Sequence, residues 1–396
     1  MAQQREVVVV SGARSAIGGY GGSLKDMPPA ELAARVISEA VARAGVEPEQ
    51  VGHLVLGNVI HTEARDMYIS RVASLTAGLP QHAPALTLNR LCGSGLQAIV
   101  TAAQTIMLGD ADITVGGGAE SMSRGGYLMP ALRWGQRMGD GGTVDMMVGA
   151  LTDPFDTVHM GITAENVAEK WGISREQQDE FAVESHRRAI AAIDAGHFKE
   201  QIVPIELKTR KGVQVFDTDE HPRRDVSLES MAKLRAVFKR DGGSVTAGNA
   251  SGINDGAAAV VLMERGAAEK AGIKPMMRLM AYGLAGVDPK YMGIGPVPAV
   301  TTALERAGLK VSDLDVVESN EAFAAQACAV SKDLGFDPAR TNPNGGAVAL
   351  GHPIGATGAI LTVKAMYELQ RIGGRYACVT MCIGGGQGIA AIFERM

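Results

Sequence analysis

The sequence is poor in cysteine, and its cysteines have no spacing typical of a metal site. The four cysteines are Cys92, Cys328, Cys378 and Cys382, and no two of them form a Cys-x-x-Cys pair. Neither a zinc site nor a redox dithiol is therefore predicted, and no structural disulfide is expected. Charged residues are also few, at 20% against 46% apolar residues. This balance indicates a globular chain with little room for disordered tails.

No segment predicts a membrane span or a nucleic-acid surface. The first residues pass from polar side chains directly into a short β-branched run, without the apolar core or cleavage site of a signal peptide. No later stretch reaches the uninterrupted apolar length of a membrane span. The formal net charge of −5 gives no overall attraction for nucleic acid, and a basic cluster between Lys208 and Arg240 is explained as solvated surface. We therefore expect a cytoplasmic protein with no membrane and no nucleic-acid partner.

The pattern of apolar residues predicts an α/β protein. A β-branched run at residues 7–10 indicates a buried strand, and residues 29–44 indicate a helix that ends at Gly45. The alternation of strand and helix returns around residues 113–116 and 316–318. Parallel α/β layers are the architecture that such an alternation favours.

The two halves of the chain repeat one order of features. In the first half a predicted strand leads to Asn58, and LCGSG follows at residues 91–95. In the second half a predicted strand leads to Asn320, and GHPIG follows at residues 351–355. After each motif come a predicted helix, a strand and a run of three glycines. A duplication of this kind would present matching loops at a shared centre.

The repeat divides the chain into three predicted parts. Residues 1–122, completed by about 246–273, form the N-terminal core half, and residues 274–396 form the C-terminal core half. Residues 123–245 break the pattern with polar loops and both tryptophans. We interpret this middle part as an inserted loop domain that covers a site.

Cys92 is a candidate nucleophile from its local sequence. It follows an apolar predicted strand and precedes an apolar predicted helix, so we expect it at a helix N-terminus. There the helix dipole and free amides lower the pKa of a thiol and favour the reactive thiolate. A buried structural cysteine is the ordinary alternative. Gly93 and Gly95 favour the nucleophile, because they would let a substrate approach the backbone.

Three further residues follow strands or turns at comparable places. His352 lies in a turn before a predicted helix, opposite Cys92 in the repeat, and would be the base that activates the thiol. Cys382 precedes three glycines whose amides could stabilise an oxyanion. Asn320 ends a strand and opens a predicted helix. Taken singly, a core histidine, a small core cysteine and an N-cap asparagine are the ordinary explanations.

Eight segments together resemble the thiolase family. They occur in the family's order and span nearly the whole chain: NRLCGSG, GGGAESMS, HMGITAEN, VTAGNASGINDGAAA, GIGPVPA, NEAFAAQ, GHPIGATGA and CIGGGQG. The chain looks most similar to bacterial β-ketothiolases of biosynthetic type, including the broad-specificity branch linked to polyhydroxyalkanoate precursors. The resemblance implies a duplicated fold with a layered αβαβα core. It also implies an acetyl-CoA C-acyltransferase that forms a homotetramer, a dimer of dimers.

The resemblance assigns roles to individual residues. Cys92 is the acylated nucleophile, His352 is its base and Cys382 is the second acid and base. Asn320, with His352 and a water, would bind the thioester oxygen, and the amides of Cys92 and Gly384 would form a second oxyanion hole. The residues implied to contact coenzyme A are Ser251, Ala247, Arg223, Leu151, His159, Met160, Phe238, Met292 and Phe323. The segment DGGSVTAGN has one residue more than the family's usual stretch. This difference affects the implied contacts with coenzyme A and not the implied chemistry.

These roles imply a ping-pong reaction with coenzyme A thioesters as substrates, no permanently bound cofactor and no metal. An acyl-CoA acylates Cys92, and acetyl-CoA deprotonated by Cys382 then attacks the acyl group. Thiolysis of a 3-ketoacyl-CoA is the reverse. The motifs fix neither the preferred chain length nor the physiological direction. For chain length, the predicted walls are Met160, Met292 and residues 127–134.

Three other functions share part of this pattern. A decarboxylating condensing enzyme has the same duplicated fold but would use a second histidine where Cys382 stands. A cysteine hydrolase would need an orienting acid beside His352, and the sequence identifies none. An idle protein that binds coenzyme A would not need Cys92 and Cys382 together. Labelling of the chain by acetyl-CoA distinguishes this last alternative.

Overall fold

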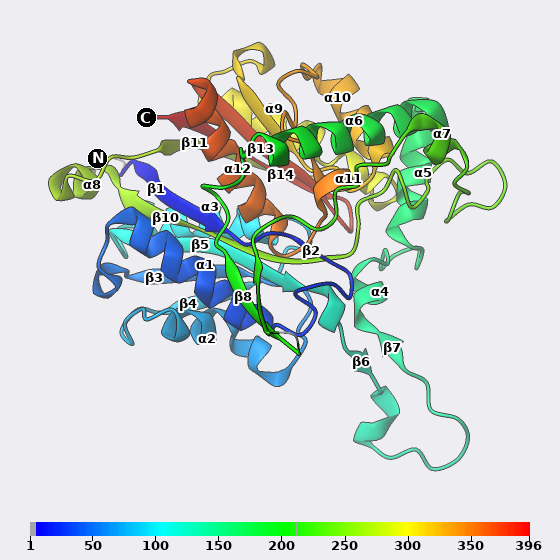
Figure 1. Cartoon of the computed structure of the whole chain (residues 1–396), viewed down its shortest axis with the longest axis horizontal. Coiled ribbons are helices and arrows are strands. Elements are labelled where there is room, and N and C mark those ends of the chain that lie inside the picture. The colour runs from blue at the N-terminus through cyan, green and yellow to red at the C-terminus, as the bar shows by residue number, and fades with distance from the viewer. Residues whose placement is uncertain (1–4, 211) are drawn as a thin grey trace.

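The computed structural model describes residues 5–210 and 212–396, and its centre is a ten-stranded sheet (Figure 1). The strands follow the order β12-β13-β14-β11-β1-β10-β5-β3-β4, with β2 paired to β10. Their bounds are β1 (Val7–Arg14), β2 (Gly18–Gly19), β3 (His53–Gly57), β4 (Ala85–Leu88), β5 (Ile113–Ser121), β10 (Asn254–Glu264), β11 (Met277–Gly286), β12 (Val316–Ser319), β13 (Tyr376–Ile383) and β14 (Gln387–Arg395). The strand predicted at residues 7–10 is therefore present and is longer than expected.

Helices cover this sheet and connect its strands. Their bounds are α1 (Pro29–Ala44), α2 (Ile69–Thr76), α3 (Ser94–Leu108), α4 (Met146–Ala150), α5 (Met160–Trp171), α6 (Arg175–Asp194), α7 (Leu228–Ala232), α8 (Arg265–Ala271), α9 (Pro296–Ala307), α10 (Ala324–Leu334), α11 (Ala347–Leu350) and α12 (Thr357–Ile372). The first helix ends at Gly45 in the left-handed conformation, as the sequence predicts.

The strand pairing confirms the predicted duplication. In the N-terminal half β10 runs antiparallel to β1 and β5, and β5 runs parallel to β3. In the C-terminal half β14 runs antiparallel to β11 and β13, and β13 runs parallel to β12. Antiparallel pairing of β1 with β11 joins the two halves.

The helices give the layered αβαβα arrangement that the resemblance implies. The paired helices α3 and α12 lie between the two halves of the sheet, because α3 contacts β3 and β5 while α12 contacts β12 and β13. On the outer faces, α1 contacts β1 and β10, and α9 contacts β11 and β14. The loops that precede α3 and α12 therefore meet near the middle of the molecule.

Helix α3 is apolar because it lies in this middle layer. Among the described residues, the 18-residue window Leu91–Leu108 is the one helix apolar enough, by length and composition, to cross a membrane. More than half of that window, 56%, is buried inside the fold. Packing between two sheet halves accounts for its composition.

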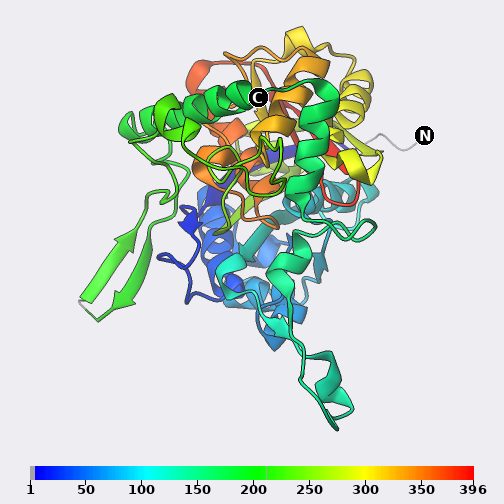
Figure 2. The ribbon, with the colours of Figure 1, turned by 90° about the vertical axis from the view of Figure 1, so that its right-hand side faces the viewer.

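The chain between β5 and β10 leaves the core and forms two projections (Figures 1 and 2). The first is an arm that contains the paired strands β6 (Tyr127–Leu128) and β7 (Val144–Asp145). The second is the hairpin of β8 (Ile205–Thr209) and β9 (Gly212–Phe216). The basic cluster predicted in this region includes Lys211, which lies outside the described residues. Some of its other members form ion pairs at the surface, as Arg224 does with Asp194.

Candidate active site

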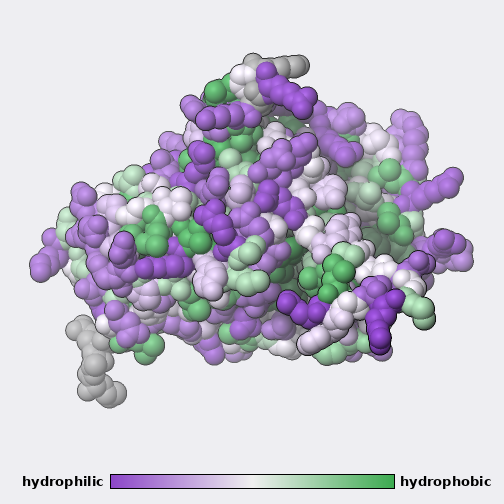
Figure 3. Space-filling view, turned by 90° about the horizontal axis from the view of Figure 1, so that it is seen from below, coloured by the Kyte–Doolittle hydropathy of each residue, from purple (hydrophilic) through white to green (hydrophobic). Residues whose placement is uncertain are grey.

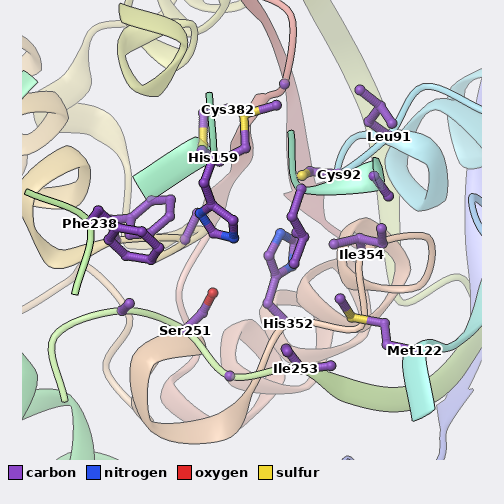
Figure 4. Close-up of a pocket in the computed structure, with 18 of the residues that line it drawn as sticks. Leu91, Cys92, Met122, His159, Phe238, Ser251, Ile253, His352, Ile354 and Cys382 are labelled. Atoms are coloured by element: carbon purple, nitrogen blue, oxygen red, sulfur yellow. The ribbon is translucent and has the colours of Figure 1, made fainter. Parts of the chain in front are cut away.

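A cavity of about 320 Å³ opens where the two core halves and the inserted segment meet (Figure 4). Cys92, His352 and Cys382 all line it, although they lie far apart in the sequence. The loop before α3 carries Cys92, the loop before α12 carries His352, and β13 carries Cys382. The duplication therefore brings its two matching loops to one cavity, as the sequence predicts.

Cys92 lies two residues before the first residue of α3. Its loop is closed by Ser94, whose Oγ donates to the Leu91 carbonyl at 2.7 Å and accepts from the Arg90 amide at 2.8 Å. Leu91 has a positive φ of 46°, a conformation rare for leucine. The Cys92 side chain stays partly exposed to the cavity. The backbone turn thus presents the thiol to a substrate.

The prediction that the helix N-terminus lowers the pKa of Cys92 is wrong for this structure. Burial among apolar side chains raises the pKa of the Cys92 thiol to about 11, although the backbone amides of Gly384 and of Cys92 itself act to lower it. Desolvation of the thiolate outweighs these donors. The resting Cys92 is therefore a neutral thiol that must lose its proton to a neighbouring base as it attacks.

His352 is positioned to be that base. Its backbone amide donates to Oδ1 of Asn254 at 2.9 Å, and its ring lies buried in the cavity wall. The Thr357 hydroxyl lies 2.6 Å from Nδ1 and donates its own hydrogen to the Pro353 carbonyl at 2.9 Å. A hydroxyl has one hydrogen, so Thr357 must accept from Nδ1–H, and this leaves Nε2 unprotonated. Burial lowers the pKa of His352 to about 4, which keeps the ring neutral.

Asn320 lies behind His352 at the end of β12. Its Nδ2 is 3.4 Å from Nε2 of His352, and its Oδ1 has no hydrogen-bond partner among the described residues. The N-cap explanation is wrong, because α10 begins at Ala324 and has Phe323 at its N-cap. The backbone amide of Asn320 donates to the Thr380 carbonyl at 2.9 Å, which holds the backbone of Asn320 at the strand end.

Cys382 and Gly384 complete the centre from the opposite side. Cys382 is fully buried on β13, and burial together with the nearby Cys92 raises the pKa of its thiol well above the ordinary value. A thiolate formed there is consequently a strong base. Gly384 also lines the cavity, and a side chain at this position would lie 2.7 Å from Cε of Met160. Its amide is one of the two that reach the Cys92 sulfur.

The glycines beside Cys92 also have a packing role that the sequence did not indicate. A Cβ on Gly95 would lie 2.7 Å from the backbone nitrogen of Ala359, and one on Gly93 would lie 2.5 Å from Cδ1 of Ile383. Gly358 faces the same crossing, where an added Cβ would lie 2.2 Å from the backbone nitrogen of Leu96. Gly95 and Gly358 let α3 and α12 approach closely, so that Cys92 and His352 reach the same cavity, whereas Gly93 leaves room for Ile383 of β13.

Most of the residues predicted to contact coenzyme A form the other wall of the cavity. Those that line it are Leu151, His159, Met160, Phe238, Ala247, Ser251, Met292 and Phe323. The rings of His159 and Phe238 stack with centroids 4.6 Å apart, and Figure 4 shows the Ser251 hydroxyl directed into the cavity. Arg223 is exposed and does not line the cavity.

Sequence reasoning missed three buried residues that hold the catalytic loops. Asn254 and Thr357 hold His352 at its amide and ring, as described above. Glu120 accepts from the amides of Ile60 and Gly355, at 3.0 and 2.8 Å, and so ties the loop after β3 to the loop that carries His352. All three lie inside motifs of the resemblance, but only contacts across the fold reveal their roles. In the part of the chain that the structure describes, no group of three metal-ligating side chains occurs.

Two thiolase family models match nearly the whole chain. The thiolase N-terminal domain matches residues 7–266, and the thiolase C-terminal domain matches residues 273–395.

Known proteins and solved structures agree with this match. Beta-ketothiolase BktB of Cupriavidus necator is 69% identical over 99% of this chain and 100% of its own length. An acetyl-CoA acetyltransferase of Allochromatium vinosum is 51% identical over 98% of this chain and 99% of its own. The crystal structure of Bacillus anthracis acetyl-CoA acetyltransferase has a TM-score of 0.98 at 46% identity, with full coverage of both chains. Human mitochondrial 3-ketoacyl-CoA thiolase in complex with CoA has a TM-score of 0.96 at 45% identity, covering 100% of this chain and 99% of its own.

Proposed function

The chain belongs to the thiolase family, and we propose that it catalyses the reversible condensation of an acyl-CoA with acetyl-CoA, an acetyl-CoA C-acyltransferase reaction. The observation that carries this proposal is the convergence of two thiols and one neutral histidine in a single apolar cavity. A decarboxylating condensing enzyme would have a histidine in place of Cys382. The thiolysis of 3-ketoacyl-CoA is the same reaction in the other direction.

In the first half-reaction Cys92 takes the acyl group from an acyl-CoA. Because its thiol is neutral at rest, the proton passes to Nε2 of His352 as sulfur attacks the thioester carbonyl. The carbonyl oxygen becomes negative and lies against the amides of Cys92 and Gly384. The carbon–sulfur bond to coenzyme A then breaks, and the Cys382 thiol gives its proton to the departing sulfur. Cys382 thereby becomes a thiolate, while His352 keeps the proton from Cys92 on Nε2.

In the second half-reaction acetyl-CoA becomes the carbon nucleophile. The Cys382 thiolate removes a proton from the carbon beside the thioester, and the enolate oxygen is held by Nε2–H of the protonated His352 and by Asn320. The unpaired buried Oδ1 of Asn320 is compatible with a water at this place. The new carbon–carbon bond forms at the acyl carbonyl, and the Cys92 sulfur leaves as a thiol with the proton from Nε2 of His352. Burial suits Cys382 to this step, since a strongly basic thiolate is needed for a weak carbon acid.

Coenzyme A is proposed to enter along the wall formed by the inserted segment. The stacked rings of His159 and Phe238, with Phe323 edge-on to Phe238, form an apolar face for the pantetheine arm. Arg223 lies outside this wall, where its exposed guanidinium suits the phosphates at the nucleotide end. Residues 123–245 would accordingly act as the loop domain that covers the substrate.

The exposed arm supports the proposal of a homotetramer. Its exposed apolar side chains are Tyr127, Leu128, Met129, Leu132, Trp134, Met138 and Val144. Apolar side chains also gather among the polar ones on the face seen from below in Figure 3. Side chains of this kind are favoured at interfaces between subunits. The four free cysteines suit the reducing cytoplasm, where we place the protein.

Mass spectrometry of the intact protein after mixing with acetyl-CoA tests the proposed chemistry. We expect one acetyl group on the wild type and on Cys382→Ala, and none on Cys92→Ala. Deuterium exchange into the methyl group of acetyl-CoA should occur with the wild type but not with Cys382→Ala. An unlabelled wild type would favour an idle protein that binds coenzyme A.

A further inference from the structure

A second cavity lies directly beside the catalytic cavity. Its volume is about 590 Å³, and it lies under the arm between the loop after β3 and the start of β6. Leu91 and Ala150 line both cavities, so these two side chains form the wall between them. None of the catalytic steps above uses the second cavity.

The apolar lining continues from the nucleophile into this second cavity. Cys92 packs against a cluster built on the buried side chains of Ile60, Met122 and Ile354. Ile60 lines the second cavity, and so do three partly buried members of the cluster, Val59, Met146 and Ala150. An alkyl chain that grows from the Cys92 sulfur in this direction first meets apolar surface.

The direction agrees with the place of coenzyme A. Figure 4 shows Leu91, Met122 and Ile354 on the side of Cys92 away from Phe238 and Ser251. The pantetheine arm is proposed to lie at Phe238 and Ser251, and the carbonyl oxygen of the acyl group points to the amides of Cys92 and Gly384. The remaining substituent of that carbonyl, the alkyl chain, is therefore left to face Leu91.

The backbone of Leu91 is fixed, although its conformation is unfavourable. Its amide donates to Oδ1 of Asn89 at 2.8 Å, and its carbonyl accepts from both the amide and the hydroxyl of Ser94. With φ held at 46°, the side chain is directed into the wall between the cavities. Strained residues that the surroundings hold in place concentrate at functional sites. Only rotation of the Leu91 side chain is left to open the wall.

We propose that the second cavity is a subsite for the distal part of an unbranched acyl chain, and that Leu91 sets the chain length beyond which this subsite is needed. The inference rests on the proposed function. The side of the subsite away from Leu91 is polar. Four polar residues line it there: His61, Thr62, Glu63 and Asn89. It therefore suits chains of medium length that end before these polar groups. Of the segment predicted to set specificity, residues 127–134, only Tyr127 and Leu128 reach this subsite.

Thiolysis rates for 3-ketoacyl-CoA substrates of increasing length test the proposal. The variant Leu91→Ala removes the wall, and we expect kcat/KM for 3-ketodecanoyl-CoA, relative to acetoacetyl-CoA, to rise about tenfold, the discrimination that one or two methylenes provide. Equal changes for all chain lengths would overturn the role of Leu91. Acetylation of Cys92 by acetyl-CoA verifies that the loop is intact in this variant.

A charge placed in the subsite gives an independent test without change at the Cys92 loop. Met67 lines the second cavity only and is 66% exposed, so Met67→Glu is tolerated by the fold. We expect Met67→Glu to lower kcat/KM for 3-ketodecanoyl-CoA relative to acetoacetyl-CoA, in both the wild-type and the Leu91→Ala backgrounds. The matched control is Tyr68→Glu, because Tyr68 is equally exposed and lines neither cavity. Equal effects of Met67→Glu and Tyr68→Glu would overturn the subsite, whereas a wild type that does not cleave acetoacetyl-CoA would overturn the proposed function instead.

Discussion

Nδ1 of His352 donates a hydrogen bond to the hydroxyl of Thr357 across 2.6 Å, and this bond determines which ring nitrogen is free to act as a base. The nitrogen proposed as the base, Nε2, is unprotonated in the neutral ring only while Nδ1 carries the hydrogen. Thr357 does not touch the reacting atoms. It is a positioning residue, and its effect on catalysis passes through the tautomer of His352.

Loss of the Thr357 hydroxyl should slow acetylation of Cys92. We expect Thr357→Val to lower the single-turnover rate by about tenfold to a hundredfold, as for other groups that orient a catalytic histidine, and Thr357→Ser to restore it. Nitrogen-15 NMR of the His352 ring should show mixed tautomers only in the valine variant. The matched control is Thr362→Val, since the Thr362 hydroxyl donates to the Gly358 carbonyl on the same helix. An unchanged ring spectrum in Thr357→Val would contradict the assignment.

Acetylation of Cys92 should persist at mildly acidic pH. Burial lowers the pKa of His352 to about 4, so the base remains neutral far below the ordinary histidine pKa of about 6.5. We expect the single-turnover rate to be constant from pH 8 to about pH 5 and to fall only near pH 4. Half-loss of the rate near pH 6.5 would show that His352 titrates normally.

The same shift predicts how stability depends on pH. Unfolded His352 binds a proton below about pH 6.5, whereas folded His352 does so only near pH 4. Protonation therefore favours the unfolded chain in this window, and the contribution of His352 to the free energy of unfolding is complete above pH 6.5 and falls as the pH drops. Urea unfolding at pH 7 and pH 5, for the wild type and His352→Asn, measures this difference. The variant should lose less stability on acidification than the wild type.

A methyl group at the crossing of α3 and α12 should disturb both stability and catalysis. In Gly358→Ala the new Cβ would lie 2.2 Å from the backbone nitrogen of Leu96, and backbone cannot move aside as a side chain does. We expect a loss of about 1–3 kcal/mol in the free energy of unfolding, as for other overpacked interiors. Urea unfolding measures the loss, and Gly141→Ala, which meets nothing within 4 Å, is the control. Equal free energies of unfolding for Gly358→Ala and Gly141→Ala would mean that α3 and α12 can move apart without loss of stability.

Removal of the apolar tip of the arm should reduce the size of the oligomer. Trp134 and Met138 are 89% and 91% exposed in the single chain. If the arm joins subunits, the double change Trp134→Asp and Met138→Asp should convert a tetramer to a dimer in sedimentation experiments. Leu108→Asp is the control, because Leu108 is 78% exposed at the end of α3, far from the arm in sequence. A variant that keeps the mass of the wild type would place the subunit contacts elsewhere.

Sequence patterns predicted the duplicated fold because they report local and repeated properties. The helix at residues 29–44 and the strand at residues 7–10 follow from side-chain periodicity, which each segment carries by itself. The matching placement of Asn58 with Asn320, and of Cys92 with His352, predicted that two loops would share a centre. Their convergence in one cavity requires nothing more than two similar halves packed face to face.

The roles of Asn254, Thr357 and Glu120 were beyond the sequence for a different reason. Each acts through hydrogen bonds to a catalytic loop, and the bonds from Gly355 to Glu120 and from His352 to Asn254 join residues 235 and 98 positions apart. No periodicity links such partners. Arg223 shows the converse, since the resemblance implied a contact with coenzyme A but the structure leaves its side chain outside the cavity.

The sequence by itself determined the family and predicted which groups react, because Cys92, His352, Asn320 and Cys382 stand in the motifs that carry the resemblance. Only the tertiary structure decided their protonation states. The helix start before α3 predicted a lowered pKa for Cys92, yet the packed cavity raises it to about 11, because desolvation depends on all the chain segments that enclose the thiol. Only the tertiary structure, too, placed Leu91 and Ala150 between two cavities. Chemical identity is local to the motifs, whereas charge state and the room for a substrate depend on how distant segments pack.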